Sequence, residues 1–301
     1  MAQDLLNVHR FTHNAMATLF EVMVGGCEEE YSGQAARAVF KEIDRIERLF
    51  NRFDPSSEIS RINRLEPGKK LSVGVETFEC LALAEETRRA TGGAFDINVR
   101  ALVKYKGRGT TPSLDVVRTS GGGFEAGLPA AEAGGFGPLD LDLGGIGKGY
   151  ALDRSLDVLA DWTVENALVH GGTSTAIAIG TAPGACDPKR GWPVGVGGDW
   201  PCPGVPESFR LRGRALSGSG TGVKGKHVLD PRTGLPASGH LAAWASHPAA
   251  AVADALSTAF MVMTTSEVAA YCERHLEVWA LVVKDYGDCR VFNGAVALEC
   301  E

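Results

Sequence analysis

Apolar and polar residues recur along this chain with two periods, and each period predicts one kind of element. A period of about 3.6 residues places Val39, Ile43, Ile46 and Phe50 on one face of a helix over 29–50. Similar spacing predicts helices over 76–91, 148–161, 252–263 and 266–276. Short apolar or alternating runs predict strands over 18–24, 139–143, 166–170, 175–179, 192–197, 209–216, 227–229, 278–283 and 290–297.

The order of these elements indicates the fold class. Helices and strands are mixed rather than strictly alternating, which favours an α+β fold with mixed, largely antiparallel sheets and packed helices. Two stretches rich in Gly, Pro and Cys, 107–138 and 180–206, are predicted to be loops or insertions. We see no repeat or linker, so we expect one domain over 1–301, with two intimately packed subdomains as the alternative.

Composition and charge narrow the choice of partners. With 301 residues and 44% hydrophobic content, the chain can bury a full core. A net charge of -7 and the lack of any Lys/Arg cluster argue against nucleic acid or an anionic membrane as a partner. A small anionic ligand would then need a local source of positive charge, such as a bound cation.

The cysteines and the apolar runs bear on location. No segment approaches the roughly 20 apolar residues that cross a membrane, and residues 1–10 lack a hydrophobic signal core, so we expect no membrane insertion. The seven cysteines form an odd set without C-x-x-C spacing. These features predict reduced thiols in a cytoplasmic protein.

A turn rich in glycine joins the predicted strand at 139–143 to the helix at 148–161. Four glycines between 144 and 149 let the backbone approach a ligand, and the helix start offers free amides. Asp142 would bind a cation or a ligand hydroxyl, and Lys148 would neutralise a phosphate. The alternative is a tight turn in which Asp142 only caps the helix.

A second cluster lies on the predicted helix at 252–263. Asp254 and Thr258 are four residues apart and therefore share one helix face, with Ser257 beside them. Carboxylate and hydroxyl oxygens suit a hard cation such as Mg²⁺. The alternative is an Asp near the helix start, followed by a Thr that bonds back to the backbone.

Three further segments offer weaker signals. Phe53 lies at a loop where a ring can stack on a ligand, although core packing is the commoner fate of Phe. The segment 91–96 ends a helix with glycines and presents Ala94, Phe95 and Asp96 in succession. His227 precedes a proline turn and is a candidate general base, or else a structural histidine.

In their order along the chain, these features resemble the ApbE family of flavin transferases, the FAD:protein FMN transferases. The matching motifs are Met16-Ala17-Thr18, Asp54 to Asn63 with Ser57-Glu58-Ile59-Ser60, Gly92-Gly93-Ala94-Phe95-Asp96, Asp142 to Tyr150 with Asp153, Gly171-Gly172, Trp192, Ser217-Gly218, His227 to Gly234, and Ala253 to Thr258. Two departures stand out, because the family's usual Gly is Ala17 here and its usual Tyr is Phe53.

The resemblance implies an activity and a T-fold-related, ApbE-like architecture. Such enzymes bind FAD and a divalent metal, usually Mg²⁺, and move FMN onto a Thr or Ser hydroxyl of an acceptor flavoprotein with release of AMP. Two other readings remain open: Mg²⁺-dependent hydrolysis of FAD to FMN and AMP, and a non-catalytic FAD-binding protein.

The resemblance also assigns residues to roles. The metal ligands would be the main-chain carbonyl of Gly145 with Asp254 and Thr258, and Ser257 is a further candidate. The FAD-contacting positions are Met16, Phe53, Ala94, Phe95, Asp96, Asp142, Lys148 and Leu229. His227 matches the family's catalytic histidine, and Asp230 is an alternative acceptor for the proton of the incoming hydroxyl.

Overall fold

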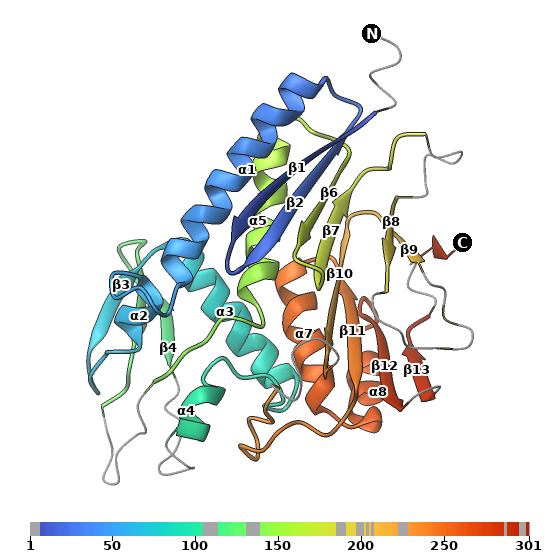
Figure 1. Cartoon of the computed structure of the whole chain (residues 1–301). Coiled ribbons are helices and arrows are strands. Elements are labelled where there is room, and N and C mark those ends of the chain that lie inside the picture. The colour runs from blue at the N-terminus through green and yellow to red at the C-terminus, as the bar shows by residue number, and fades with distance from the viewer. Residues whose placement is uncertain are drawn as a thin grey trace.

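The centre of the molecule is an eight-stranded sheet in the order β1-β2-β6-β7-β10-β11-β12-β13, in which every neighbouring pair is antiparallel (Figure 1). The computed structural model describes residues 7–104, 114–130, 139–184, 191–196, 202, 205, 208–221, 228–285, 288–294 and 299–300. The strands of this main sheet are β1 (Val8–Ala15), β2 (Thr18–Gly25), β6 (Ala167–Gly171), β7 (Thr175–Ile179), β10 (Arg214–Gly220), β11 (Ala242–His247), β12 (Trp279–Asp285) and β13 (Asp288–Phe292).

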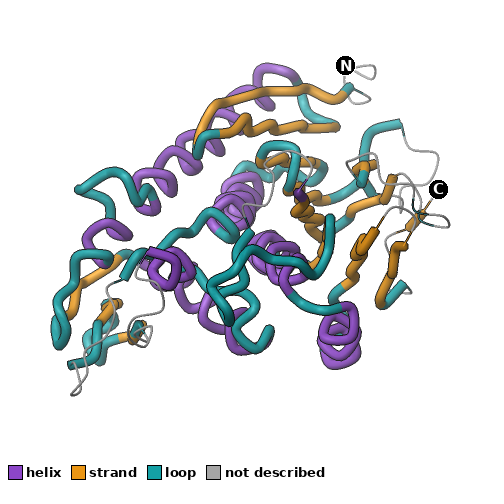
Figure 2. Tube along the Cα trace, turned by 60° about the horizontal axis from the view of Figure 1, so that its bottom comes forward, coloured by secondary structure: helices purple, strands orange, loops and turns teal. Residues whose placement is uncertain are grey.

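Helices cover one face of the main sheet. The helices α1 (Glu29–Phe50), α5 (Gly147–Asp161) and α7 (Ala250–Val262) pack side by side, and α8 (Thr265–Arg274) packs near the β12–β13 edge. Helices and sheet strands form separate layers in the turned view (Figure 2). The predicted helices are confirmed, and the apolar face of α1 is buried as expected. None of the helices in the described part of the chain is long and apolar enough to cross a membrane.

A second, smaller sheet lies at the far end of α1 and α3 (Val75–Ala90), in the order β3-β5-β4 (Figure 1). Its strands are β3 (Lys70–Val73), β4 (Asp115–Arg118) and β5 (Phe124–Gly127), and two short helices, α2 (Glu58–Ile62) and α4 (Val99–Lys104), complete this end. The prediction of a loop over all of 107–138 was wrong, because β4 and β5 are four-residue strands whose pattern is too short to read.

A third sheet covers the other face of the main sheet. It runs β14 (Glu299–Cys300), β9 (Ser208–Leu211) and β8 (Trp192–Gly195). Side chains alternate between the two faces of a strand, so that Ala215 faces the helices while Leu216 packs in a second core with Phe209 and Trp244. The strand predicted over 209–216 is in fact two strands, because a turn through Gly213 (φ 61°) divides β9 from β10.

The cysteine prediction is corrected at this sheet. Cys202 and Cys289 form a disulfide with a Cα–Cα distance of 5.6 Å, although 87 residues separate them in sequence. Spacing along the chain did not reveal the pair, because the fold brings the two cysteines together. Among the described residues, Cys27, Cys80 and Cys272 are free thiols.

Two strands of the main sheet escaped prediction. β1 carries many polar residues, and β11 has the alanine-rich sequence AAWASH, so neither shows a clear strand pattern.

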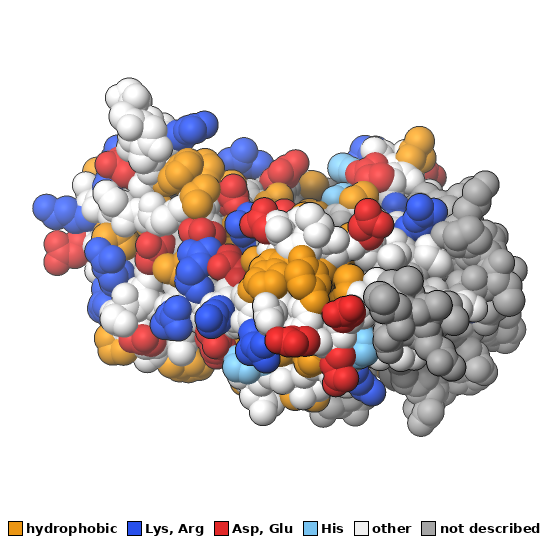
Figure 3. Space-filling view, turned by 90° about the horizontal axis from the view of Figure 1, so that it is seen from above, with side chains coloured by type: hydrophobic (Ala, Val, Ile, Leu, Met, Phe, Trp, Pro, Cys, Tyr) orange, Lys and Arg blue, Asp and Glu red, His pale blue; other side chains and the backbone are white. Residues whose placement is uncertain are grey.

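Seen from above, acidic and basic side chains are interspersed on the coloured part of the surface (Figure 3).

A candidate cation and anion site between two helices

The helices α5 and α7 touch at their N-terminal ends. A Cβ atom on Gly149 would overlap the carbonyl oxygen of Ala250, so only glycine allows this approach. The Gly149 amide donates a hydrogen bond to Asp254 Oδ2 at 3.2 Å. In return, the amides at the start of α7 donate to Asp153, from Ala250 at 2.6 Å and from Ala251 at 2.9 Å. Each helix start therefore binds an aspartate of the other helix.

Lys148 and Asp254 form an ion pair at this junction. The ammonium Nζ lies 3.2 Å from Oδ2 and 3.3 Å from Oδ1, and it also contacts the Gly144 carbonyl oxygen at 3.4 Å. Asp254 is 3% exposed, whereas the Lys148 side chain is 20% exposed. The Asp254 carboxylate is thus buried inside the protein, and the Lys148 side chain that pairs with it extends toward the surface.

Gly145 and Thr258 lie together beside this pair. A Cβ on Gly145 would lie 3.2 Å from Thr258 Oγ1 and 3.3 Å from the ring of Phe95. The structure therefore brings Gly145 together with Asp254 and Thr258, which lie far from it in the sequence. The alternative for Thr258 also holds in part, because its hydroxyl is 3.3 Å from the Asp254 carbonyl oxygen one turn back.

The donor set at this junction fits a hard cation. Carboxylate, hydroxyl and carbonyl oxygens are the ligands that Mg²⁺ prefers. Within the described part of the chain, no group of three His, Cys, Asp or Glu side chains could hold a metal. Ser257 is fully buried, and its hydroxyl is held by the Asp254 carbonyl oxygen at 2.9 Å, which makes it a supporting residue rather than an open ligand.

Sequence reasoning missed two hydroxyls that bind Asp254. Thr175 on β7 and Ser217 on β10 each lie 3.3 Å from Asp254 Oδ1. They are a directly opposed cross-strand pair. In the sequence, Ser217 stands out only as part of a motif and Thr175 does not stand out, because the strand register that aims both side chains at α7 cannot be read from the sequence.

Asp142 lies in the extended segment before α5 and does not cap this helix. Its segment is extended, but it is not a strand: the amides of 140, 141 and 142 bind the Asn98 side chain, the Asn63 side chain and the Ile97 carbonyl. The helix cap is Ile146, so Asp142 does not cap α5. Its carboxylate accepts from the Gly144 amide at 2.9 Å and pairs with Arg52 at 3.3 Å.

Arg52 is a further residue that the sequence did not single out. Its guanidinium bridges Asp140 and Asp142 and lies 5.2 Å from the centre of the Phe53 ring. Phe53 is 83% exposed, so its ring is free to stack on a planar ligand.

Two of the three residues predicted to contact FAD in the segment 91–96 are buried. Ala94 and Phe95 are 1% and 4% exposed, which leaves little of either side chain for a ligand to contact. Asp96 accepts from the Asn98 amide at 2.7 Å, and burial raises the pKa of its carboxyl above the ordinary value.

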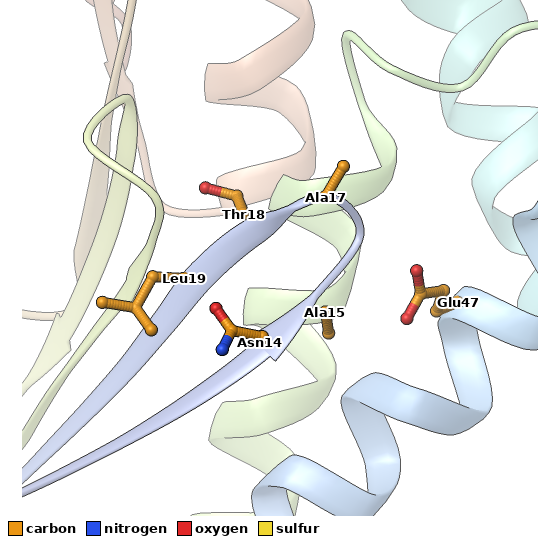
Figure 4. A pocket seen from close by; sticks show the side chains of 6 residues that line it. All are labelled: Asn14, Ala15, Ala17, Thr18, Leu19 and Glu47. Carbon is orange, nitrogen blue, oxygen red and sulfur yellow. The ribbon is translucent and has the colours of Figure 1, made fainter.

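Met16 lies at the tip of the β1–β2 hairpin. A cavity of about 370 Å³ borders this turn and is lined by Asn14, Ala15, Ala17, Thr18, Leu19 and Glu47 (Figure 4). Met16 and Ala17 both have positive φ angles, 49° and 57°, as a two-residue hairpin turn requires.

The third predicted segment is only partly described. His227 lies outside the described residues. Val228 and Leu229 are described, and the strand predicted over 227–229 is reduced there to an isolated bridge between Leu229 and Pro236. Both carboxylate oxygens of Asp230 are bound by Arg232, at 3.0 and 3.1 Å.

Fold and site together define a class: an α+β protein in which a lysine, an aspartate and hydroxyl groups meet where two helices begin. The sequence comparisons agree with this class and narrow it. Residues 16–282 match the model of the ApbE family, and the chain belongs to that family.

Individual relatives support the same assignment. An FAD:protein FMN transferase of Chlamydia muridarum is 27% identical in an alignment of 263 residues, and the match covers 78% of this chain and 78% of its own. One of Treponema pallidum is 26% identical over 76% of this chain and 71% of its own. The ApbE protein of Thermotoga maritima superposes with a TM-score of 0.77 at 26% identity, covering 98% of this chain and 100% of that one. The predicted α+β, ApbE-like fold is confirmed.

Proposed function

We propose that this chain transfers the FMN part of FAD to a threonine or serine hydroxyl of an acceptor flavoprotein and releases AMP, with Mg²⁺ as the resident cation. The observation that carries the proposal is the convergence of Lys148, Asp254, Thr258 and Gly145 at the α5–α7 junction of an ApbE family member. The relatives named above as FAD:protein FMN transferases support it.

The arrangement suits cleavage of a pyrophosphate. Asp254, Thr258 and the Gly145 carbonyl would hold Mg²⁺, which when bound neutralises charge on phosphate oxygens. Lys148 sits next to this position and supplies a second positive charge to the same anion. The ring of Phe53 is exposed and lies next to the Arg52 guanidinium, and it would stack on the flavin or adenine ring.

A base must take the proton of the incoming hydroxyl. Because Arg232 occupies both oxygens of Asp230, we assign this role to His227. His227 precedes Leu229 by two residues, and Leu229 is tied by its bridge to Pro236. The hydroxyl oxygen would bond to the FMN phosphorus while the bond from that phosphorus to the bridging oxygen breaks, AMP would leave with that oxygen, and the imidazole would keep the proton of the hydroxyl.

One incubation separates the three candidate activities. Purified protein is mixed with FAD, Mg²⁺ and a peptide from an acceptor flavoprotein, and the products are identified by mass spectrometry. Transfer gives covalent flavin on the peptide and AMP, hydrolysis gives free FMN and AMP, and a binding protein leaves FAD intact. Either of the last two results would contradict the proposal.

The metal assignment has its own variant. Asp254→Asn keeps the size of the side chain but removes the charge that binds the cation, so we expect Mg²⁺-dependent AMP release to be lost while the fold remains. Asp161→Asn, at the exposed end of α5, is the matched control and should leave release unchanged. AMP release by Asp254→Asn at the wild-type rate would overturn the metal assignment.

The cytoplasmic location stays a prediction. Disulfides persist mainly in oxidising compartments, so the Cys202–Cys289 bond is an argument against it. Counting free thiols in protein isolated without reductant from its own cell would decide the question.

A further inference from the structure

We propose that Thr175 and Ser217 are positioning residues that fix the Asp254 carboxylate for cation binding. The inference rests on the proposed function, since it concerns the same cation. Neither hydroxyl is expected to touch FAD or the acceptor; each acts through Asp254.

The two hydroxyls are buried and aimed at one oxygen. Thr175 is 2% exposed and Ser217 is 0% exposed, and their Oγ atoms are 2.9 Å apart. Each Oγ lies 3.3 Å from Asp254 Oδ1. They come from neighbouring strands, β7 and β10, so the rigid sheet determines where this oxygen sits.

Counting protons shows how the group is connected. Three contacts join the two hydroxyls and Oδ1, but only two protons are available, because an ionised carboxylate only accepts. Because the two Oγ atoms are only 2.9 Å apart, one hydroxyl donates to the other, which leaves the second free to donate to Asp254. On the opposite side, the Gly149 amide donates to Oδ2. With one buried donor on each oxygen, the plane of the carboxylate is fixed, and the oxygens face the side where Lys148 lies.

The same network reaches the second proposed ligand. Ser217 contacts Ser257 at 3.3 Å, and Ser257 contacts Ser219 at 2.9 Å. Ser219 in turn lies 3.5 Å from Thr258 Oγ1. A chain of hydroxyls thus connects Asp254 with Thr258, and removing Ser217 breaks its first link, the one to the Asp254 carboxylate.

A merely structural role makes a different prediction. Buried hydroxyls that only filled space would be replaceable by Ala or Val with a change in stability alone. Positioning residues must instead change the affinity for the cation, because a carboxylate that is free to rotate pays an ordering cost when the cation binds.

The test measures Mg²⁺ binding by calorimetry on the full chain with FAD present. Thr175→Val keeps the shape without the hydroxyl, and Ser217→Ala removes it. A hydrogen bond to a charged group supports an expected rise in the Mg²⁺ Kd of roughly ten-fold or more for each variant. Thr175→Ser retains the hydroxyl and should stay within about two-fold of the wild type on the same reasoning.

Ser155→Ala is the matched control. Ser155 is also fully buried, but its hydroxyl donates to the Ala151 carbonyl oxygen within α5 and lies outside the network. We expect a small change in Tm and an unchanged Mg²⁺ Kd. Should Thr175→Val fail to fold, Ser217→Ala alone decides, because it removes one atom.

The outcomes separate this inference from the proposed function. Wild-type Mg²⁺ affinity in both Thr175→Val and Ser217→Ala, with only Tm lowered, would overturn the positioning role. Failure of the wild type to bind Mg²⁺ would overturn the cation site and the inference together. Mg²⁺ binding without flavin transfer would contradict the transferase proposal and leave the positioning role standing.

Discussion

Asp153 on α5 and Asp254 on α7 each accept hydrogen bonds from the first turn of the other's helix. The exchange satisfies amides that a helix start leaves without partners. It also places both negative charges at the positive ends of helix dipoles. Asp153 binds the first amides of α7, the helix that carries the proposed metal ligand Asp254. The position of Asp254 is therefore coupled to the contact that Asp153 makes with its helix.

This coupling predicts a pH dependence of stability. Burial raises the pKa of Asp153 from 3.8 to about 6 in the folded chain. The folded state then holds a proton that the unfolded state has already lost, so this contribution is greatest at low pH and disappears as pH rises through about 6. At 1.36 kcal/mol per pKa unit, the loss is about 3 kcal/mol.

Asp153→Asn should remove this dependence. We expect the free energy of unfolding of the wild type, minus that of the variant, to fall by about 2 kcal/mol between pH 4 and pH 7 and to stay level above that. Urea denaturation of both proteins across this range measures the difference, in which the other titrating groups largely cancel. A difference that stays constant with pH would contradict the raised pKa.

The close approach of α5 and α7 predicts a strong effect at Gly149. In Gly149→Ala the new Cβ would overlap the Ala250 carbonyl, so the helices must separate and the Gly149–Asp254 bond must lengthen. We expect a loss of about 3 kcal/mol or more in unfolding free energy. Gly147→Ala is the control: its Cβ would lie 3.4 Å from Phe50, an ordinary contact, and should change stability by about 1 kcal/mol or less.

The hairpin turn predicts a stabilising substitution. Ala17 has a φ of 57° and is exposed, and a left-handed conformation costs a non-glycine residue about 1–2 kcal/mol. The greater freedom of glycine in the unfolded chain offsets roughly 0.5–1 kcal/mol of this. Ala17→Gly should therefore stabilise the protein by about 0.5–1 kcal/mol in urea denaturation. Ala160→Gly, exposed in α5, should instead destabilise it by about 1 kcal/mol, and equal effects of the two would rule out the turn strain.

Features within a single element could be predicted from the sequence, whereas contacts between distant segments could not. The bounds of α1 follow from a long apolar stripe, and the pairing of Asp254 with Thr258 follows from helical spacing. Contacts between segments did not follow: Thr175 meets Asp254, and Cys202 meets Cys289, only through sheet register and tertiary packing. The alternation at 139–143 was misread, because side chains of Asn63 and Asn98 replace the neighbouring strand.

The disulfide predicts a stability that depends on reductant. Closing a long loop limits the unfolded chain, and such a bond typically contributes about 2–4 kcal/mol. Cys289→Ser should lose this amount, and the wild type should lose the same amount when treated with dithiothreitol. The variant should not respond to dithiothreitol, and neither should the double variant Cys202→Ser/Cys289→Ser. A wild type whose stability is unchanged by full reduction would contradict a stabilising bond.

The positive charge of Lys148 should strengthen the binding of the anionic ligand. Its ammonium is the positive charge bound to Asp254 and extends toward the surface, so an FAD pyrophosphate beside the cation would gain a charge-assisted bond from it. Lys148→Met removes the charge but keeps the apolar stem, and we expect the FAD Kd to rise by roughly ten-fold or more. Calorimetry at low and high salt measures it, and the salt dependence should weaken in the variant because one phosphate contact is lost. Lys41→Met, exposed on α1, tests whether any lost lysine has this effect. An FAD Kd that is equal in Lys148→Met and wild type would place the pyrophosphate away from the α5 start.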